Sequence, residues 1–143
     1  TTEIYTLSLH DALPICLIHD LGECFIGDIP TFAKTDADEA REEAELMAWV
    51  RSLPEPVSGE MEALYREMIA LETPEAKLYK AMDKLEAIVQ HNESDIATWE
   101  PHEYQLNMTY ADDAVAWSPV LRELREAIRN DTKAKIAAAE QQA

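Results

Sequence analysis

Apolar side chains recur at intervals of three and four residues along most of this chain, and no segment shows the sustained apolar and polar alternation of a half-buried strand. This periodicity predicts an all-α fold, with a helix over residues 16–23 and four amphipathic helices after it. Thr35, Thr73 and Ser118 are expected to cap three of the helix starts. The residues expected to face the core are Leu17, Ile18 and Leu21 in the first helix, Ala40, Ala44, Met47 and Val50 in the second, Met61, Leu64, Met68 and Leu71 in the third, Leu78, Met82, Leu85 and Val89 in the fourth, and Val120, Leu121, Leu124 and Ile128 in the last.

The connections between these helices carry typical turn residues. Gly22 and Gly27 bracket a short turn, and Pro54 is expected to end the second helix. Residues 91–110 contain a proline and scattered polar side chains, so they are expected to form a long loop or short irregular helices. At the other end, residues 137–143 are expected to form a frayed tail.

The first fifteen residues, TTEIYTLSLHDALPI, read as the in-frame translation of a common sequencing-adapter oligonucleotide. A segment with such an origin does not belong to the natural protein and carries no information about its fold. We therefore expect residues 1–15 to be non-native and the natural domain to occupy residues 16–136, with Pro14 in the first turn of its first helix. His10 and Asp11 fall inside the adapter-like segment and are not expected to contribute to a site.

The size and charge of the chain narrow the possible partners. Its 143 residues are enough for one domain, and 12 Lys and Arg against 29 Asp and Glu give a net charge of −17. Such a surface repels nucleic acids and anionic membranes. Cys16 and Cys24 form no CxxC pair, which predicts buried, reduced thiols and a cytoplasmic location. The tryptophans are expected in the core or at an interface.

The segment LIHDLGECFIGDIP carries the candidate chemistry. His19 and Asp20 stand in an apolar helix, where ionised groups need a partner or a metal. Glu23 follows four residues after His19, so helical spacing brings it to the same end of the helix, beside the turn of Gly27 and Asp28. Imidazole with carboxylates suits Mn, Fe, Co, Zn or Mg. The alternative is a helix end closed by a His–Asp hydrogen bond, with Asp28 only turning the chain.

HDLGECFIGDIP, followed by a charged helix with Arg41, Glu42 and Glu43 and later by EAKLYKAMDKLEAIVQ, resembles the HD-domain metal-dependent phosphohydrolases. Within that family it is most similar to the 5′-deoxynucleotidase branch, over about residues 16–136. The resemblance implies an all-α helical bundle with a divalent metal ion. It also implies metal ligands and catalytic carboxylates at these positions: His19, Asp20 and Asp83 for the metal, and Glu23 and Asp28 for catalysis.

Two features of the sequence depart from that pattern. Periodicity alone predicts that Asp83 is a solvated charge near Lys80, whereas the resemblance implies that it binds metal. The family's first metal-binding His and a substrate-contacting Arg belong to an upstream helix, which this sequence lacks. His10 lies only nine residues before His19 and is not expected to replace that ligand. We therefore expect a partial HD domain, without its N-terminal helix or helices and with doubtful activity of its own.

The resemblance implies an enzyme that removes the 5′-phosphate from deoxynucleoside monophosphates. It also implies a small-molecule nucleotide substrate and a homodimer in the intact parent, while the charge argues against nucleic-acid and membrane partners. Other HD-domain hydrolases cleave cyclic or hyperphosphorylated nucleotides, although the short carboxylate turn GECFIGDIP favours the monophosphatase. A noncatalytic helical fragment that binds partners through an exposed face is the third alternative.

Overall fold

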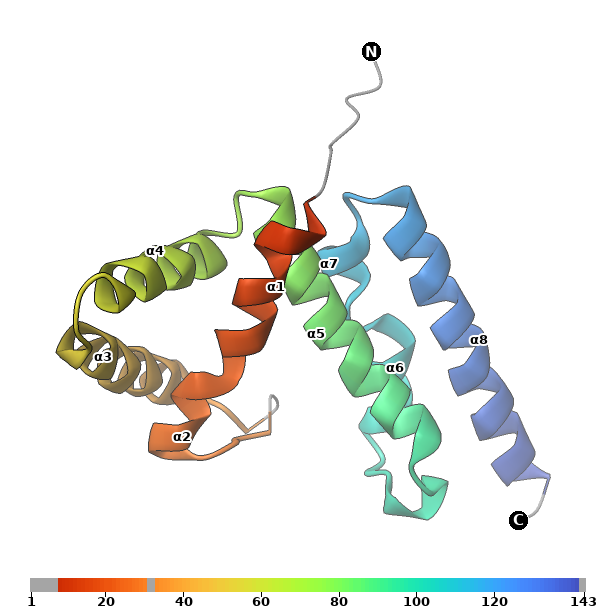
Figure 1. Ribbon diagram of the computed structural model, residues 1–143. Coiled ribbons are helices and arrows are strands. Elements are labelled where there is room, and N and C mark those ends of the chain that lie inside the picture. Colours follow the sequence, from red (N-terminus) through yellow and green to blue (C-terminus); the bar gives the residue numbers. More distant parts are fainter. Residues whose placement is uncertain (1–7, 31–32, 142–143) are drawn as a thin grey trace. The chain divides into compact units, whose positions relative to one another are not determined.

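The computed structural model describes residues 8–30 and 33–141, and every regular element among them is helical (Figure 1), which confirms the all-α fold class. The described residues divide into two compact units, one up to Tyr79 and one from Lys80 onward. The elements in chain order are α1 (Leu9–Ile18), the 3-10 helix η1 (His19–Gly22), α2 (Glu23–Ile26), α3 (Asp36–Ser52), α4 (Val57–Ala70), α5 (Pro74–Glu93), the 3-10 helix η2 (Ile96–Thr98), α6 (Glu103–Thr109), α7 (Asp112–Val115) and α8 (Pro119–Glu140).

Three of the helices begin at the caps that the sequence predicts. The Thr35 hydroxyl accepts a hydrogen bond from the Asp38 amide at 3.3 Å, and the Asp38 carboxylate accepts one from the Thr35 amide at 3.0 Å, which completes a capping box for α3. The hydroxyl of Thr73 accepts from the Ala76 amide at 3.2 Å at the start of α5. Ser118 caps α8, with Pro119 in the first turn.

The first helix begins earlier than the sequence predicts. Ser8 caps α1, and Pro14 lies inside the helix and not in its first turn. Of the adapter-like segment 1–15, residues 1–7 lie outside the described residues. Ala12 and Ile15 are buried, and the Ser8 amide donates to the Glu75 carboxylate at 3.0 Å. The adapter origin of this segment is not tested by these contacts and stays a prediction.

Two apolar clusters form the core of the first unit. In one, Tyr65 of α4 is fully buried against residues of α3, and its hydroxyl donates to the carbonyl of Ile18 at 2.8 Å. In the other, Ile15 of α1 packs against Ala76 and Tyr79 of α5. The first cluster consists of Leu46, Met47, Val50 and Tyr65, with Ile18, Leu21, Met61 and Met68 packed against it. Both clusters hold the C-terminal half of α1, directly before His19.

Several residues expected in the core of this unit are exposed. Leu17 is 79% exposed, so the prediction that it is buried is wrong, and the exposed Cys24 contradicts the expected burial of both thiols. Ala40 and Ala44 of α3 are exposed as well, because α3 turns Leu46, Met47 and Val50 toward α4. Leu71 adopts a left-handed conformation (φ 50°) that ends α4, where it is 37% exposed. These errors share a cause, since periodicity marks an apolar stripe but not which neighbours cover it.

The buried helix faces of the second unit are rotated from the predicted ones. On α5, Ala81, Leu85 and Ile88 are buried, whereas the predicted core residues Met82 and Val89 are 42% and 37% exposed. On α8 the buried positions are Leu121, Arg125, Ile128 and Thr132, and the predicted Val120 and Leu124 are exposed. A stripe that contains an arginine and a threonine does not show as apolar in the sequence.

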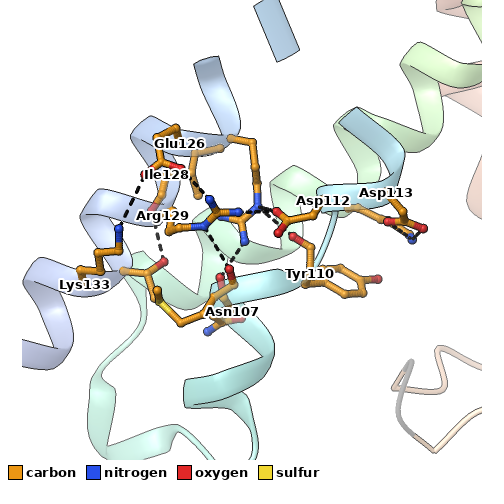
Figure 2. A network of polar contacts seen from close by, with 12 residues as sticks. Asn107, Tyr110, Asp112, Asp113, Glu126, Ile128, Arg129 and Lys133 are labelled. Atoms are coloured by element: carbon orange, nitrogen blue, oxygen red, sulfur yellow. Dashed lines mark hydrogen bonds and ion pairs between the residues drawn. The ribbon is translucent and has the colours of Figure 1, made fainter. Parts of the chain in front are cut away.

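Arg125 joins α8 to the segment between α6 and α7. Its side chain is only 2% exposed, its Nε donates to the carbonyl of Tyr110 at 2.8 Å, and its Nη2 donates to the carbonyl of Asn107 at 3.0 Å. The Asp112 carboxylate lies 3.0 Å from the same Nε, and Arg129 bonds to Asp112 from the next turn of α8 (Figure 2). These bonds satisfy carbonyls at the end of α6 that have no helical partner.

The remaining expectations for the C-terminal part are met in part. Residues 91–110 contain the end of α5 and the short helices η2 and α6, as one of the two predicted alternatives requires. The helix α8 continues to Glu140, so residues 137–140 are helical, and fraying of the tail in solution stays a prediction. Among the described residues, no helix combines the length and the apolar character needed to cross a membrane.

Candidate metal and catalytic site

The candidate site begins where α1 tightens into the 3-10 helix η1. Gly22, the last residue of η1, is buried against α3. A Cβ atom added to Gly22 would lie 2.6 Å from Oε1 and 2.8 Å from Cγ of Glu42, both closer than van der Waals contact allows. The absence of a side chain at Gly22 therefore lets the Glu42 carboxylate lie directly against the backbone that carries His19, Asp20 and Glu23.

The hydrogen bonds of His19 define the roles of its two ring nitrogens. Nδ1 lies 2.8 Å from the carbonyl oxygen of Cys16, and because a carbonyl only accepts, Nδ1 carries the proton. Nε2 lies 3.0 Å from Oδ2 of Asp20. The imidazole and the carboxylate that the sequence places next to each other are therefore in direct contact at this helix end. The sequence-based alternatives of a His–Asp contact and a metal site both agree with this geometry.

An imidazole nitrogen and a carboxylate oxygen are ligands of the kinds that divalent metal ions bind, and the 3.0 Å contact between His19 Nε2 and Asp20 Oδ2 brings one of each together. The His19 side chain is 24% exposed and packs against the ring of Tyr79 at 5.3 Å, whereas Asp20 is 61% exposed. The bond from His19 to the Cys16 carbonyl orients the imidazole, as is common for metal-binding histidines.

Glu23 lies in a cluster of carboxylates at the start of α2. Burial raises the pKa of this carboxyl group, and the negative charges of Asp20, Asp28 and Glu42 raise it further, while Lys34 acts in the opposite direction. A carboxyl group that keeps its proton to a higher pH is suited to proton transfer near neutrality. Asp28 follows Gly27, whose φ of 89° lies in the left-handed region that favours glycine, and it is exposed on the turn.

Lys34 and Glu42 form an ion pair beside this cluster. The ammonium nitrogen lies 2.6 Å from Oε2 of Glu42, and the two side chains are 23% and 16% exposed. From the sequence, Glu42 is predicted only as one residue of a charged helix. The sequence does carry a signal for a paired carboxylate at this position, because Glu42 precedes the buried Leu46 by one helical turn, and a carboxylate on a core-facing stripe needs a partner.

Asp83, the third predicted ligand, belongs to the second unit. Its side chain is 32% exposed, and the Lys80 ammonium lies 2.8 Å from its Oδ2, which confirms the predicted proximity of this pair. Residues 8–30 and 33–141 contain no group of three or more His, Cys, Asp or Glu side chains placed to hold a metal ion. Because His19 and Asp20 lie in the other unit, the three-residue ligand set stays a prediction. His10 is 96% exposed and contacts Asp11 at 3.3 Å.

The HD domain profile matches residues 3–125 of the chain. This chain belongs to the HD domain family. The matched range crosses the boundary between the two compact units, so both units contribute to this HD domain. The resemblance seen in the segment HDLGECFIGDIP is thereby confirmed.

Curated relatives of this HD domain carry the name 5′-deoxynucleotidase. The chain is 31% identical to 5′-deoxynucleotidase HDDC2 of Danio rerio over 107 residues, which cover 73% of this chain and 54% of the relative. It is 31% identical to 5′-deoxynucleotidase HDDC2 of Homo sapiens over 93 residues, 64% of this chain and 46% of the relative. The protein 5′-deoxynucleotidase hdd1 of Schizosaccharomyces pombe is 33% identical over 84 residues, 54% of this chain and 42% of that protein.

These matches confirm the predicted branch of the family. The chain spans about half the length of the curated relatives that it matches. No solved structure matches it at a comparable level of significance.

Proposed function

We propose that this HD domain is a metal-dependent phosphohydrolase that removes the 5′-phosphate from deoxynucleoside monophosphates. The observation that carries the proposal is the geometry of His19, whose Nε2 lies 3.0 Å from Asp20 Oδ2 while Nδ1 is occupied by the Cys16 carbonyl. This arrangement presents two donors of the kind that divalent metals bind. The names of the relatives supply the substrate class, and the raised pKa of Glu23 supplies a group for proton transfer.

We propose His19, Asp20 and Asp83 as the residues that hold a divalent ion, with Mn, Co, Fe, Zn and Mg as candidates. When bound, such an ion supplies Lewis-acid polarisation of a phosphoryl oxygen and offsets the repulsion between a phosphate and a protein of net charge −17. The hydrogen bond between Nδ1 and the Cys16 carbonyl orients the His19 imidazole.

Glu23 and Asp28 are the proposed catalytic carboxylates. An ionised Glu23 accepts a proton from the attacking water on a carboxylate oxygen, and the protonated group returns it to the departing nucleoside oxygen. The raised pKa of Glu23 favours both steps, because the protonated and ionised forms are then closer in free energy near neutral pH. Asp28, exposed on the turn after Gly27, orients the water by accepting its second hydrogen bond.

The decisive experiment combines calorimetric titration of Mn²⁺ or Co²⁺ with phosphate release from deoxynucleoside monophosphates. Asp20→Ala should weaken metal binding and abolish release, whereas Glu23→Gln should keep metal binding and lose turnover. Glu45→Gln on the exposed side of α3 is the matched control and should behave as the wild type. Full turnover in Glu23→Gln would refute the role given to that residue.

A nucleotide panel separates this function from its alternatives. Faster hydrolysis of cyclic nucleotides or guanosine polyphosphates would assign the chain to another branch of HD hydrolases. A calorimetric titration that shows no tight metal site sensitive to Asp83→Ala would identify the chain as a noncatalytic helical domain. The homodimer, the cytoplasmic location and the lack of nucleic-acid or membrane partners stay predictions.

A further inference from the structure

The connection between α2 and α3 carries Asp28 and returns to α3 through Lys34. It closes locally, because the amides of Ala33 and Lys34 both donate to the carbonyl of Pro30, at 2.7 and 3.0 Å. At its other end, the Gly27 amide donates to the Glu23 carbonyl at 2.7 Å. These short-range bonds shape the two ends of the connection, but none of them attaches it to another helix.

The Lys34 side chain makes that attachment. Its ammonium lies 2.6 Å from Oε2 of Glu42, two helical turns into α3, and both side chains are mostly buried. On its other side, the Glu42 carboxylate lies against Gly22, where a Cβ would come within 2.6 Å of Oε1. Glu42 therefore contacts the backbone directly before Glu23, while Lys34, six residues after Asp28 and two before the start of α3, contacts Glu42 from the C-terminal end of the connection.

We propose that the Lys34–Glu42 ion pair is a clamp that holds the Glu23–Asp28 turn against α3 and so positions these two carboxylates. Lys34 and Glu42 are positioning residues and not catalytic ones. The value of the clamp for the reaction rests on the function proposed above, whereas the attachment of the turn to α3 can be tested without any reaction.

Burial and charge favour a clamp over an incidental surface pair. Exposed ion pairs contribute little, but removing one partner of a mostly buried pair leaves an uncompensated charge. The pKa of Lys34 is raised, first by its bond to Glu42 and then by the charges of Glu42, Glu23 and Glu39 against an opposing effect of burial. Without the ammonium group, repulsion among the neighbouring carboxylates would push the turn away from α3.

Hydrogen exchange of the full-length chain, followed by mass spectrometry of peptides over residues 23–34, tests the clamp. We expect Lys34→Met to speed exchange of the Gly27, Ala33 and Lys34-position amides at least tenfold. Lys34→Arg should restore near wild-type protection, since arginine keeps the charge and the reach. The double variant Lys34→Met with Glu42→Gln should exchange more slowly than Lys34→Met alone, because it removes the Glu42 charge that Lys34→Met leaves without its ammonium partner.

Matched controls separate the clamp from general destabilisation. Lys133→Met removes a lysine from a pair that is 50% exposed on both sides, and it should leave exchange in residues 23–34 unchanged. Peptides of α8 in Lys34→Met report whether the rest of the chain stays folded. Unchanged protection of residues 23–34 in Lys34→Met, or faster exchange that Lys34→Arg fails to restore, would overturn the clamp.

Phosphate release supported by Mn²⁺ adds a catalytic measurement. If the wild type is active, we expect Lys34→Met to lower kcat at least tenfold with KM changed less than threefold, and Lys34→Arg to recover most of kcat. A parental kcat in Lys34→Met would overturn the positioning role. If the wild type releases no phosphate, the proposed function fails, and the exchange experiment alone decides whether the clamp exists.

Discussion

Replacing Gly22 by alanine tests the close packing between η1 and α3. The backbone of Gly22 is compatible with alanine, since its φ of −61° and ψ of −34° are those of a right-handed helix. The added methyl group would lie 2.6 Å from Oε1, 2.8 Å from Cγ and 3.1 Å from Cδ of Glu42. Because Cγ as well as the carboxylate lies too close, the Glu42 side chain must shift, and we expect this shift to weaken its ion pair with Lys34.

The magnitude follows from two opposing effects. Overpacking of this kind costs about 1 to 3 kcal/mol. The smaller entropy of the unfolded chain with alanine returns about 0.4 to 1 kcal/mol. We expect Gly22→Ala to lower the free energy of unfolding by about 1.5 kcal/mol in total.

Urea denaturation followed by circular dichroism at 222 nm measures this change, and Gly59→Ala is the matched control. Gly59 lies in α4, where the nearest atom to an added Cβ is Oε2 of Glu55 at 3.2 Å, the far end of a side chain that accepts a hydrogen bond from the Gly59 amide. That substitution should stabilise the chain by about 0.5 to 1 kcal/mol. A Gly22→Ala variant as stable as the wild type would show that Glu42 is not held against η1. In a background that carries Glu42→Ala, Gly22→Ala should lower the free energy of unfolding by less than it does in the wild type, because the side chain that the new methyl group meets has been removed.

Three further predictions concern buried and titrating groups. Arg125→Met should lower the free energy of unfolding by about 3 kcal/mol, because it removes the donors to one buried and one partly buried backbone carbonyl, and the same denaturation assay measures the loss. Burial, with a smaller effect of the Cys24 charge, raises the pKa of Tyr65 from 10.0 to about 12, so the stabilisation by its protonated phenol is complete below pH 10 and is lost as the pH rises toward 12. Absorbance titration should show one tyrosine ionising last, and Tyr65→Phe should remove that step. The raised pKa of Glu23 means that its contribution to stability is complete below its ordinary value of 4.5 and is lost as the pH rises, so Glu23→Gln should be more stable than the wild type at pH 7, and equal stability would contradict this reasoning.

The carboxylate cluster around Glu23 connects the stability of the fold with the proposed metal-dependent function. Asp20, Glu23, Asp28 and Glu42 gather negative charge at one end of α1 and η1, and because the Lys34 ammonium offsets this charge only in part, the placement costs stability. Proteins accept such costs at functional sites. Added Mn²⁺ should therefore stabilise the wild type more than Asp20→Ala, a difference that thermal unfolding measures without any substrate.

The positions of the helices could be predicted largely from the sequence. The capping residues Thr35, Thr73 and Ser118 act on the first turn of their own helices, so their effect depends only on nearby residues. The candidate segment could be singled out in part for the same reason, because His19, Asp20 and Glu23 lie within about one helical turn of each other, whereas their proposed roles rest on the resemblance to the HD domain family. Membership of the HD domain family also follows from the order of residues along the chain.

Only the tertiary structure decided which helix faces are buried and which charges are paired. On α5 the buried residues Ala81, Leu85 and Ile88 form an apolar stripe that overlaps the predicted one, and on α8 the buried face contains Arg125 and Thr132. Which face packs therefore depends on partners distant along the chain. The same holds for Glu42, whose role requires both the bare backbone of Gly22 and the ammonium of Lys34. Local periodicity and capping depend on neighbours within a few residues, whereas burial and ion pairing depend on which segments the folded chain brings into contact.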